Sequence, residues 1–262
     1  MTDRDSKVFV RLRRPVPDGE MAFRCEFEIE GLEEPIATRS IGSDAVQAYE
    51  LALEFAALHL LASPAYQSGR LTFGGTYDLR LPVPDCYRCL VRTDLERDRV
   101  VREFAGQPTG TERFSDERLA RLDDKSKVWP DRPEDAPVVL ERVLDLRRGR
   151  KRTDVRVVFR KPVPGRLGHW CAFKIDGLLA KPHARTGMGG DDPIESLRNA
   201  MRLAMVYMVS SSAYQRGQLT WLGMHDLGMP ILEDAEPLIR KDLHAKAMAE
   251  LLMNPPRLRR KG

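Results

Sequence analysis

One short segment of the chain alternates apolar and polar residues, and a second segment repeats it in the other half of the chain. Residues 23–29 read Phe-Arg-Cys-Glu-Phe-Glu-Ile, and residues 170–175 read Trp-Cys-Ala-Phe-Lys-Ile. Successive side chains of a strand point to opposite faces of a sheet, so this pattern predicts half-buried β-strands. A shorter apolar segment precedes each of them, at residues 8–12 and 155–159, and a Pro-x-Pro turn lies between. The pattern therefore predicts one pair of strands in each half of the chain.

A long apolar segment follows each strand pair after about ten irregular residues. Residues 46–61 and 194–209 are apolar at most positions, which is typical of helices enclosed on most sides. Each segment starts at an aspartate with Gln or Glu three residues later, the pattern of a capping box. These residues are Asp44 with Gln47, and Asp192 with Glu195. We interpret the two aspartates as helix caps.

A narrow polar stripe runs along each predicted helix. Its members lie three or four residues apart and so share one helical face; they are Gln47, Glu50 and Glu54 in the first helix and Glu195, Arg198 and Arg202 in the second. The last two matched positions have opposite charges, with Glu in the first helix and Arg in the second. We predict that Glu50, Glu54, Arg198 and Arg202 bind a partner; a contact between the two helices, or simple solvation, would also explain the pattern.

Much of the chain is duplicated. Residues 63–82 recur as residues 211–230, with eleven of the twenty positions identical, which indicates two copies of one structural unit. Each copy contains Ala-Tyr-Gln-x-Gly after the helix, and its glycine, Gly69 or Gly217, suits a left-handed position. A last strand is predicted at residues 71–73 and 219–221. The predicted order in each unit is β-β-α-β.

The segments outside the repeat are predicted separately. Residues 138–146 alternate well enough to form an extra strand, with a hairpin turn at residues 147–152, and residues 86–92 could replace that strand in the first copy. Between positions 94 and 135, 21 of 42 residues are charged, which favours a solvated helical insert. Residues 236–253 predict an amphipathic helix with a basic tail behind it.

We therefore predict an α+β protein with two repeated units, each a small antiparallel sheet with one helix packed across it, plus a charged helical insert and a C-terminal helix. The predicted boundaries are 1–92 for the first unit, 93–135 for the insert, 136–232 for the second unit, and 233–262 for the C-terminal helix and tail. A unit of this size buries only roughly 60% of its unfolded surface, so we expect the copies to pack about a pseudo-twofold relation.

The composition is that of a globular protein, with 42% hydrophobic and 31% charged residues among 262. The start of the chain lacks the apolar stretch of a signal peptide, and no apolar run suggests a membrane span, so we expect a cytoplasmic protein. The net charge of +4 is the small difference between 43 basic and 39 acidic residues. It supports nucleic-acid binding only weakly.

Cys86-x-x-Cys89 is the one motif with a familiar chemical spacing. A structural zinc site needs four ligands, and no second pair exists in the sequence. We interpret the pair as structural thiols and predict no metal and no cofactor; a redox pair is the other reading. Cys25 and Cys171 occupy matched positions in the predicted strands, where cysteine behaves as a small core residue.

No catalytic residue is predicted. His225 has a polar context, but its counterpart in the other copy is Tyr77, so we interpret it as structural. The shared Asp78 and Asp226 are expected to accept hydrogen bonds from backbone amides in a turn. Residues 187–190 are glycine-rich and precede a helix, but two aspartates follow and would repel a phosphate.

Basic clusters offer an alternative function. They are Arg147, Arg148, Arg150, Lys151 and Arg152 in the predicted hairpin, and Arg257, Arg259, Arg260 and Lys261 in the tail. Such clusters can track phosphates, although neither is interleaved with the aromatic residues that single-strand binding prefers.

The repeated unit resembles a family of short bacterial domains of unknown function. The second copy carries the pattern best, at Cys171, Asp192, Leu219, Trp221, Leu222, Gly223, Leu227, Gly228 and Pro230. The first copy retains Cys25, Asp44, Gln47 and Pro82 but departs at Phe73, Gly74 and Arg80. These are core and turn residues, so the resemblance implies a fold and no activity.

From these observations we expect a non-catalytic protein-binding module, in a narrower form an immunity or antitoxin-type protein. The first alternative is an RNA- or DNA-binding accessory protein that uses the basic clusters. A further alternative is an enzyme of unfamiliar type with a site between the repeats. The sequence identifies neither the partner nor the oligomeric state.

Overall fold

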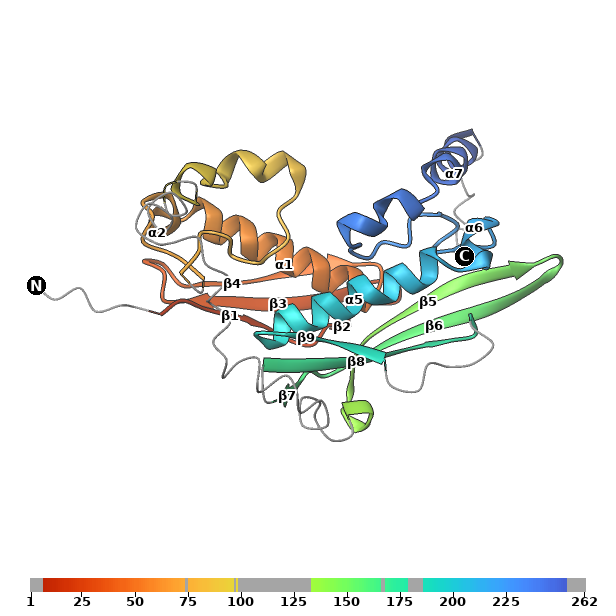
Figure 1. Ribbon diagram of the computed structural model, residues 1–262, viewed down its shortest axis with the longest axis horizontal. Helices are drawn as coiled ribbons and strands as arrows, with labels where there is room; N and C mark the ends of the chain where they lie inside the picture. The colour runs from red at the N-terminus through yellow and green to blue at the C-terminus, as the bar shows by residue number, and fades with distance from the viewer. Residues whose placement is uncertain are drawn as a thin grey trace, which may run out of the picture. The chain divides into compact units, whose positions relative to one another are not determined.

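The computed structural model describes residues 7–73, 75–96, 98, 133–165, 168–178 and 186–253 (Figure 1). The chain divides into two compact units, Met1–Ser126 and Lys127–Gly262. Each unit contains an antiparallel sheet and one long helix, which confirms the predicted α+β class and its two repeated units. Most of the predicted charged insert lies outside the described residues.

The described part of the first unit includes helical residues at 93–96, and before them it contains a four-stranded sheet, a long helix and two short helical segments. In chain order they are β1 (Phe9–Leu12), β2 (Val16–Pro17), β3 (Phe23–Glu30), β4 (Ile36–Gly42), α1 (Ala45–Ala62), α2 (Pro64–Gln67) and the 3₁₀ helix η1 (Asp85–Leu90). Strand β3 is central: β1 and β2 pair along one side of it and β4 along the other. Helix α1 packs across β3 and β4.

The second unit repeats this arrangement and adds two strands. Its elements are the 3₁₀ helix η3 (Pro133–Asp135), β5 (Val138–Arg148), β6 (Lys151–Arg160), β7 (Val163–Gly165), β8 (Gly168–Asp176), β9 (Thr186–Gly190), α5 (Pro193–Val209), α6 (Ser212–Gln215), β10 (Leu219–Thr220), the 3₁₀ helix η4 (Glu233–Leu238) and α7 (Lys241–Met253). Strands β6 to β9 match β1 to β4. Strand β5 pairs with the outer side of β6, and β10 pairs with β5.

Both long helices start at the predicted aspartates. The Asp44 carboxylate accepts a hydrogen bond from the Gln47 backbone N–H at 2.8 Å, and Asp192 accepts one from Glu195 at 2.8 Å. The Gln47 and Glu195 side chains reach back to the residue before the cap, Ser43 or Asp191, at 2.7 Å. The caps are therefore confirmed, and each box closes one residue earlier than in the usual motif.

The cores of the two units are built from the same positions. On β3 the buried side chains are Cys25, Phe27 and Ile29, and on β8 they are Cys171, Phe173 and Ile175. Each cysteine thiol donates to a backbone oxygen, at 3.3 Å for Cys25 and 3.2 Å for Cys171. Burial raises the pKa of both thiols to about 12, so they stay protonated core groups, as predicted.

The residues expected to be irregular before each helix are strands, β4 and β9. The prediction was wrong there because both end in glycine, and Thr186–Gly190 has three glycines in five residues. These glycines serve close packing. A Cβ at Gly42 would lie 2.3 Å from the backbone nitrogen of Ala48, and one at Gly190 would lie 2.3 Å from that of Ser196. Residues 187–190 are therefore a paired strand that supports α5 and not a phosphate loop.

The extra strand and its hairpin are confirmed. Strands β5 and β6 pair antiparallel, and Gly149 takes a positive φ of 63° in the turn between them. The hairpin extends to one end of the second sheet in Figure 1. Strand β10 forms because β5 offers it a partner; the matched residues 71–73 have no strand among the described residues, only an isolated bridge between Phe73 and Thr76.

Two further predictions need correction. Residues 86–92 do not form a strand: most of them belong to η1, which starts directly after Pro84. The C-terminal helix α7 begins at Lys241 and not at residue 236, because Pro237 lies in the separate 3₁₀ helix η4. A proline has no backbone N–H to continue an α-helix.

Helix α1 is, within the part of the chain that the structure describes, long and apolar enough to cross a membrane by length and composition. The expectation that no apolar run is long enough to suggest a membrane span was therefore wrong for this helix. However, 56% of that stretch is buried within the fold, as in the core helix of a globular unit. The cytoplasmic location stays a prediction.

Candidate functional site

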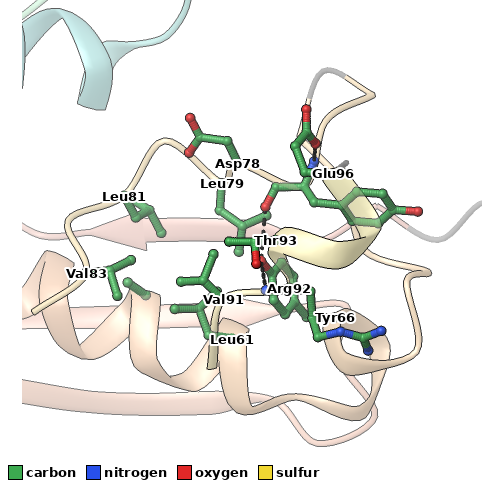
Figure 2. Close-up of a pocket in the computed structure, with 12 residues that line it drawn as sticks. Leu61, Tyr66, Asp78, Leu79, Leu81, Val83, Val91, Arg92, Thr93 and Glu96 are labelled. Atoms are coloured by element: carbon green, nitrogen blue, oxygen red, sulfur yellow. Dashed lines mark hydrogen bonds between the residues drawn. The ribbon is translucent and has the colours of Figure 1, made fainter. Parts of the chain in front are cut away.

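The first unit contains a hollow of about 150 Å³ beside the end of α1 (Figure 2). Most of its lining is aliphatic or aromatic; the lining residues are Ala57, Leu61, Tyr66, Tyr77, Asp78, Leu79, Leu81, Val83, Val91, Arg92, Thr93 and Glu96. Figure 2 shows Leu61, Leu81, Val83 and Val91 gathered beside the helix, while the Asp78 and Glu96 carboxylates lie away from this group. The hollow is therefore suited to apolar groups.

The polar groups around the hollow are held by bonds within the unit. The Tyr66 hydroxyl donates to the Tyr77 backbone oxygen at 3.1 Å and accepts from the Arg92 backbone N–H at 3.3 Å. The Glu96 carboxylate accepts from the Tyr77 N–H at 2.8 Å. Burial raises the pKa of the Tyr66 hydroxyl, which keeps it a hydrogen-bond donor. These hydrogen bonds hold together the chain segments that line the hollow.

The Arg92 side chain completes this closure. Its guanidinium donates to both oxygens of Asp94, at 2.8 and 2.6 Å, and to the Gln67 backbone oxygen. The hydrogen bond from Arg92 lowers the pKa of Asp94 to about 2. We call Tyr66, Gln67, Arg92 and Asp94 the latch of the first unit.

The second unit has the same latch, formed by Tyr214, Gln215, Arg240 and Asp242. Tyr214 donates to the His225 backbone oxygen at 3.2 Å and accepts from the Arg240 N–H at 3.3 Å, and Arg240 donates to Asp242 at 2.8 and 2.6 Å. Sequence analysis missed the latch because residues 84–91 and 232–239 differ strongly. The available signal was the equal spacing of 26 residues from Tyr66 to Arg92 and from Tyr214 to Arg240. Since both units have it, the latch is a structural element.

The residues around the hollow differ between the units in size. Ala57 matches Met205, Val83 matches Ile231, and Val91 matches Ile239, at a constant offset of 148 residues. Met205 is buried in the second unit. At these three positions the first unit has the smaller side chain, whereas Leu61 is larger than its match Val209.

A buried arginine distinguishes the second unit further. Arg142 on β5 is fully buried, lies 3.9 Å above the Trp221 ring, and donates to the Leu227 backbone oxygen at 2.6 Å. Gly228 makes room for it, because a Cβ there would lie 2.5 Å from the Trp221 ring. In the first unit the position of Gly228 is held by Arg80, which adopts a similar positive φ of 57°.

The predicted turn aspartates are confirmed. Asp78 accepts from the Arg80 N–H at 2.9 Å, and Asp226 accepts from the Gly228 N–H at 2.8 Å. His225 lies next to this turn, and burial lowers the pKa of its imidazole, with a nearby cation at Arg240 acting in the same direction. Its Nδ1 atom is buried without a hydrogen-bond partner among the described residues.

The predicted partner-binding residues lie on α1 and α5. Glu50 and Glu54 are partly buried on α1, and burial raises the pKa of the Glu54 carboxyl. On α5, Arg202 is partly buried and Arg198 is only 7% exposed. The Arg198 side chain is therefore buried, whereas the other three keep part of their surface exposed. Partner binding by these residues stays a prediction.

The remaining candidates lie apart from the hollow. Cys86 and Cys89 are free and exposed on η1, and no group of three or more potential metal ligands occurs among the residues with described positions. In the hairpin, Arg147, Arg148, Arg150 and Lys151 are exposed, and Arg152 pairs with Asp145 at 2.6 Å. The tail cluster of Arg257, Arg259, Arg260 and Lys261 lies outside the described residues.

Residues 1–83 and 140–231 match one family model, that of the Domain of unknown function (DUF6968). The two segments correspond to the two copies of the repeat, and they leave out the latch residues Arg92, Asp94, Arg240 and Asp242. No curated protein and no solved structure matches the chain.

Proposed function

The chain belongs to the family described as Domain of unknown function (DUF6968), and we propose from its own site that it is a non-catalytic module that binds another protein. The observation that supports this most is the apolar hollow of about 150 Å³ in the first unit. Its polar neighbours Tyr66, Arg92 and Glu96 are engaged in bonds that hold the unit together. An apolar surface of this kind gains free energy when a partner removes it from water.

The test uses a variant that fills the hollow with the residue of the other copy. Ala57→Met introduces the side chain of Met205, and Ala62→Met places the same change on the exposed end of α1 as a matched control. Proteins that co-purify with the wild type and with Ala62→Met, but not with Ala57→Met, are identified, produced in pure form and titrated by calorimetry. The proposal fails if every purified binder has equal affinity for all three proteins while thermal unfolding shows that all are folded.

A narrower form of the proposal is that the partner is a toxin, as for an immunity or antitoxin protein. It is supported by the absence of a catalytic motif in the sequence and by the duplication of the unit. Co-expression with the product of a neighbouring gene tests it. Wild type and Ala62→Met should relieve growth inhibition by a toxin, and Ala57→Met should not.

A second function, nucleic-acid binding, is favoured by the β5–β6 hairpin. Four cations, Arg147, Arg148, Arg150 and Lys151, are exposed around its turn. Fluorescence anisotropy with labelled oligonucleotides at several salt concentrations tests this function, because each neutralised phosphate contributes to the salt dependence. If Arg150→Glu with Lys151→Glu leaves the salt slope unchanged, the hairpin is not the binding site.

A further inference from the structure

Strand β5 closes one side of the second unit. It pairs with β6 over most of its length and with β10 near its end. Its inward side chains Leu140, Leu144 and Leu146 are fully or almost fully buried, and Arg142 lies among them in the same row. The strand therefore covers an apolar strip and satisfies the outer edge of β6.

The first unit has no such strand in its described residues. Strand β1, which matches β6, pairs with β3 on one side and with no described strand on the other. Residues 71–73, which match β10, make only the Phe73–Thr76 bridge. The place that β5 fills in one copy is thus open, in the described part of the chain, in the other.

Burial at matched positions reports the same difference. Four residue pairs are apolar in both copies but half-exposed in the first unit and fully buried in the second: Val10 and Val157, Leu12 and Phe159, Leu71 and Leu219, and Leu79 and Leu227. Val157 lies directly opposite Arg142 in the β5–β6 register, and the Leu227 carbonyl accepts the Arg142 hydrogen bond. These four partly exposed residues of the first unit are therefore ones whose counterparts surround β5.

We propose that the first unit binds an extended segment of its partner protein as an added strand along β1, in the position that β5 holds in the second unit. This inference rests on the protein-binding proposal and names its mode, addition of a strand to a sheet edge. One long side chain of the segment then reaches the hollow from the side of Leu79, because Leu227, the match of Leu79, accepts the Arg142 hydrogen bond in the second unit.

The register defines the chemistry of the segment. Every second residue of the added segment would point to the buried face of the sheet, as Leu140 and Leu144 of β5 do, and these residues are aliphatic. On the outer face Glu141 lies opposite Val158, whose match in β1 is Arg11. A carboxylate at this position of the segment would share the Arg11 guanidinium with Glu30 of β3, so the segment alternates aliphatic residues with at least one acidic residue.

The probe is a labelled peptide with the sequence of residues 138–148, added to the full-length protein and followed by fluorescence anisotropy. A control peptide has the residues matching Leu144 and Asp145 exchanged, which breaks the alternation at constant composition. We expect the first peptide to bind and the control not to bind. Ala57→Met should weaken binding by about tenfold, and Ala62→Met should leave it unchanged.

A double-mutant cycle tests the place of the long side chain. Phe73→Trp supplies the ring found at Trp221 and should strengthen binding of the arginine-containing peptide by about threefold. A peptide with Met in place of that arginine should bind Phe73→Trp no more tightly than the wild type. Equal effects on both peptides would mean that the arginine does not reach this ring.

Hydrogen exchange identifies the docking edge. Binding should slow exchange of backbone amides within Phe9–Leu12, and light scattering should show one protein chain per complex. Suppose that Ala57→Met weakens binding of a natural partner, but that neither this partner nor the peptide slows exchange of the β1 amides. Strand addition is then wrong, and the protein-binding proposal stands. If the peptide protects β1 and no protein partner depends on Ala57, the edge is open but the protein-binding proposal fails. A doubled mass without peptide would identify a second copy as the occupant and overturn the proposal.

Discussion

The guanidinium of Arg142 lies 3.9 Å above the ring of Trp221 in the interior of the second unit, although the two residues are far apart in the sequence. A cation over an aromatic face gains electrostatic energy when water is excluded. Arg142 also holds the Leu227 carbonyl at 2.6 Å. This pair joins the added strand β5 to the closing turn of the repeat.

Replacing Arg142 should destabilise the second unit. Arg142→Ala leaves a cavity and removes the donor to Leu227, so the free energy of unfolding should fall by about 3 kcal/mol. Arg142→Met keeps much of the volume and should cost about 1 kcal/mol. Urea unfolding measures both. Arg156→Ala, which removes an exposed ion pair with Glu141, is the control and should cost about 0.5 kcal/mol or less.

Substitutions at the matched turn residues Gly228 and Arg80 should change stability in opposite directions. Gly228→Ala places a Cβ 2.5 Å from the Trp221 ring and should cost about 2 kcal/mol. Arg80 has a positive φ of 57°, a backbone conformation that costs a residue with a Cβ more than it costs glycine. Arg80→Gly removes this cost and should stabilise the first unit by about 0.5 kcal/mol. Thermal unfolding of the two variants distinguishes the signs, and a loss of stability in Arg80→Gly would show that its side chain contributes more than its backbone conformation costs.

The latch should make stability depend on pH in acid. Hydrogen bonds from Arg92 and Arg240 lower the pKa values of Asp94 and Asp242 from 3.8 to about 2. A carboxyl with a lowered pKa in the folded state stabilises the protein above its unfolded pKa, and this contribution is lost as pH falls through about 2. The melting temperature should therefore fall between about pH 4 and pH 2. Asp94→Asn with Asp242→Asn should flatten that part of the profile.

His225 should add a second pH dependence nearer neutrality. Burial lowers its pKa below the ordinary 6.5, so the folded state favours the neutral imidazole. Below about pH 6.5 the imidazole binds a proton more readily in the unfolded chain than in the folded one. The free energy of unfolding should therefore decrease as the pH falls below this value. His225→Tyr, which installs the residue found at Tyr77, should remove this decrease. An unchanged profile in the variant would assign the effect to another group.

The Cys86 and Cys89 pair should bind no zinc. Both thiols are free and exposed, and two cysteines supply half of the ligands that a structural zinc site needs. Elemental analysis of protein purified without chelator should find far less than one equivalent. One equivalent of zinc that disappears in Cys86→Ala would contradict the prediction.

Local patterns were sufficient for much of the fold. The alternation in residues 23–29 and its repeat at 170–175 predicted the central strands, and Asp44 and Asp192 predicted the helix starts. Strand burial and capping depend on neighbours in the sequence. The glycine-rich strand β9 was missed since its glycines are required by the close approach of α5, a contact that no local pattern contains.

The candidate site was not predictable in the same way. The latch joins Tyr66 to Arg92 across residues 84–91, which differ strongly from their counterparts 232–239. The hollow is lined by residues such as Ala57, whose role depends on their neighbours in space. The duplication did show where to compare the two units once their structures were known.

The sequence by itself determined that the chain contains two copies of one α+β unit, with capped helices and cysteine-containing core strands, because these features follow from periodicity and adjacent residues. Only the tertiary structure decided that Leu71 and Leu79 are half-exposed while their matches Leu219 and Leu227 are buried. The physical reason is that burial depends on what packs against a residue, and the second unit has β5 to cover these positions.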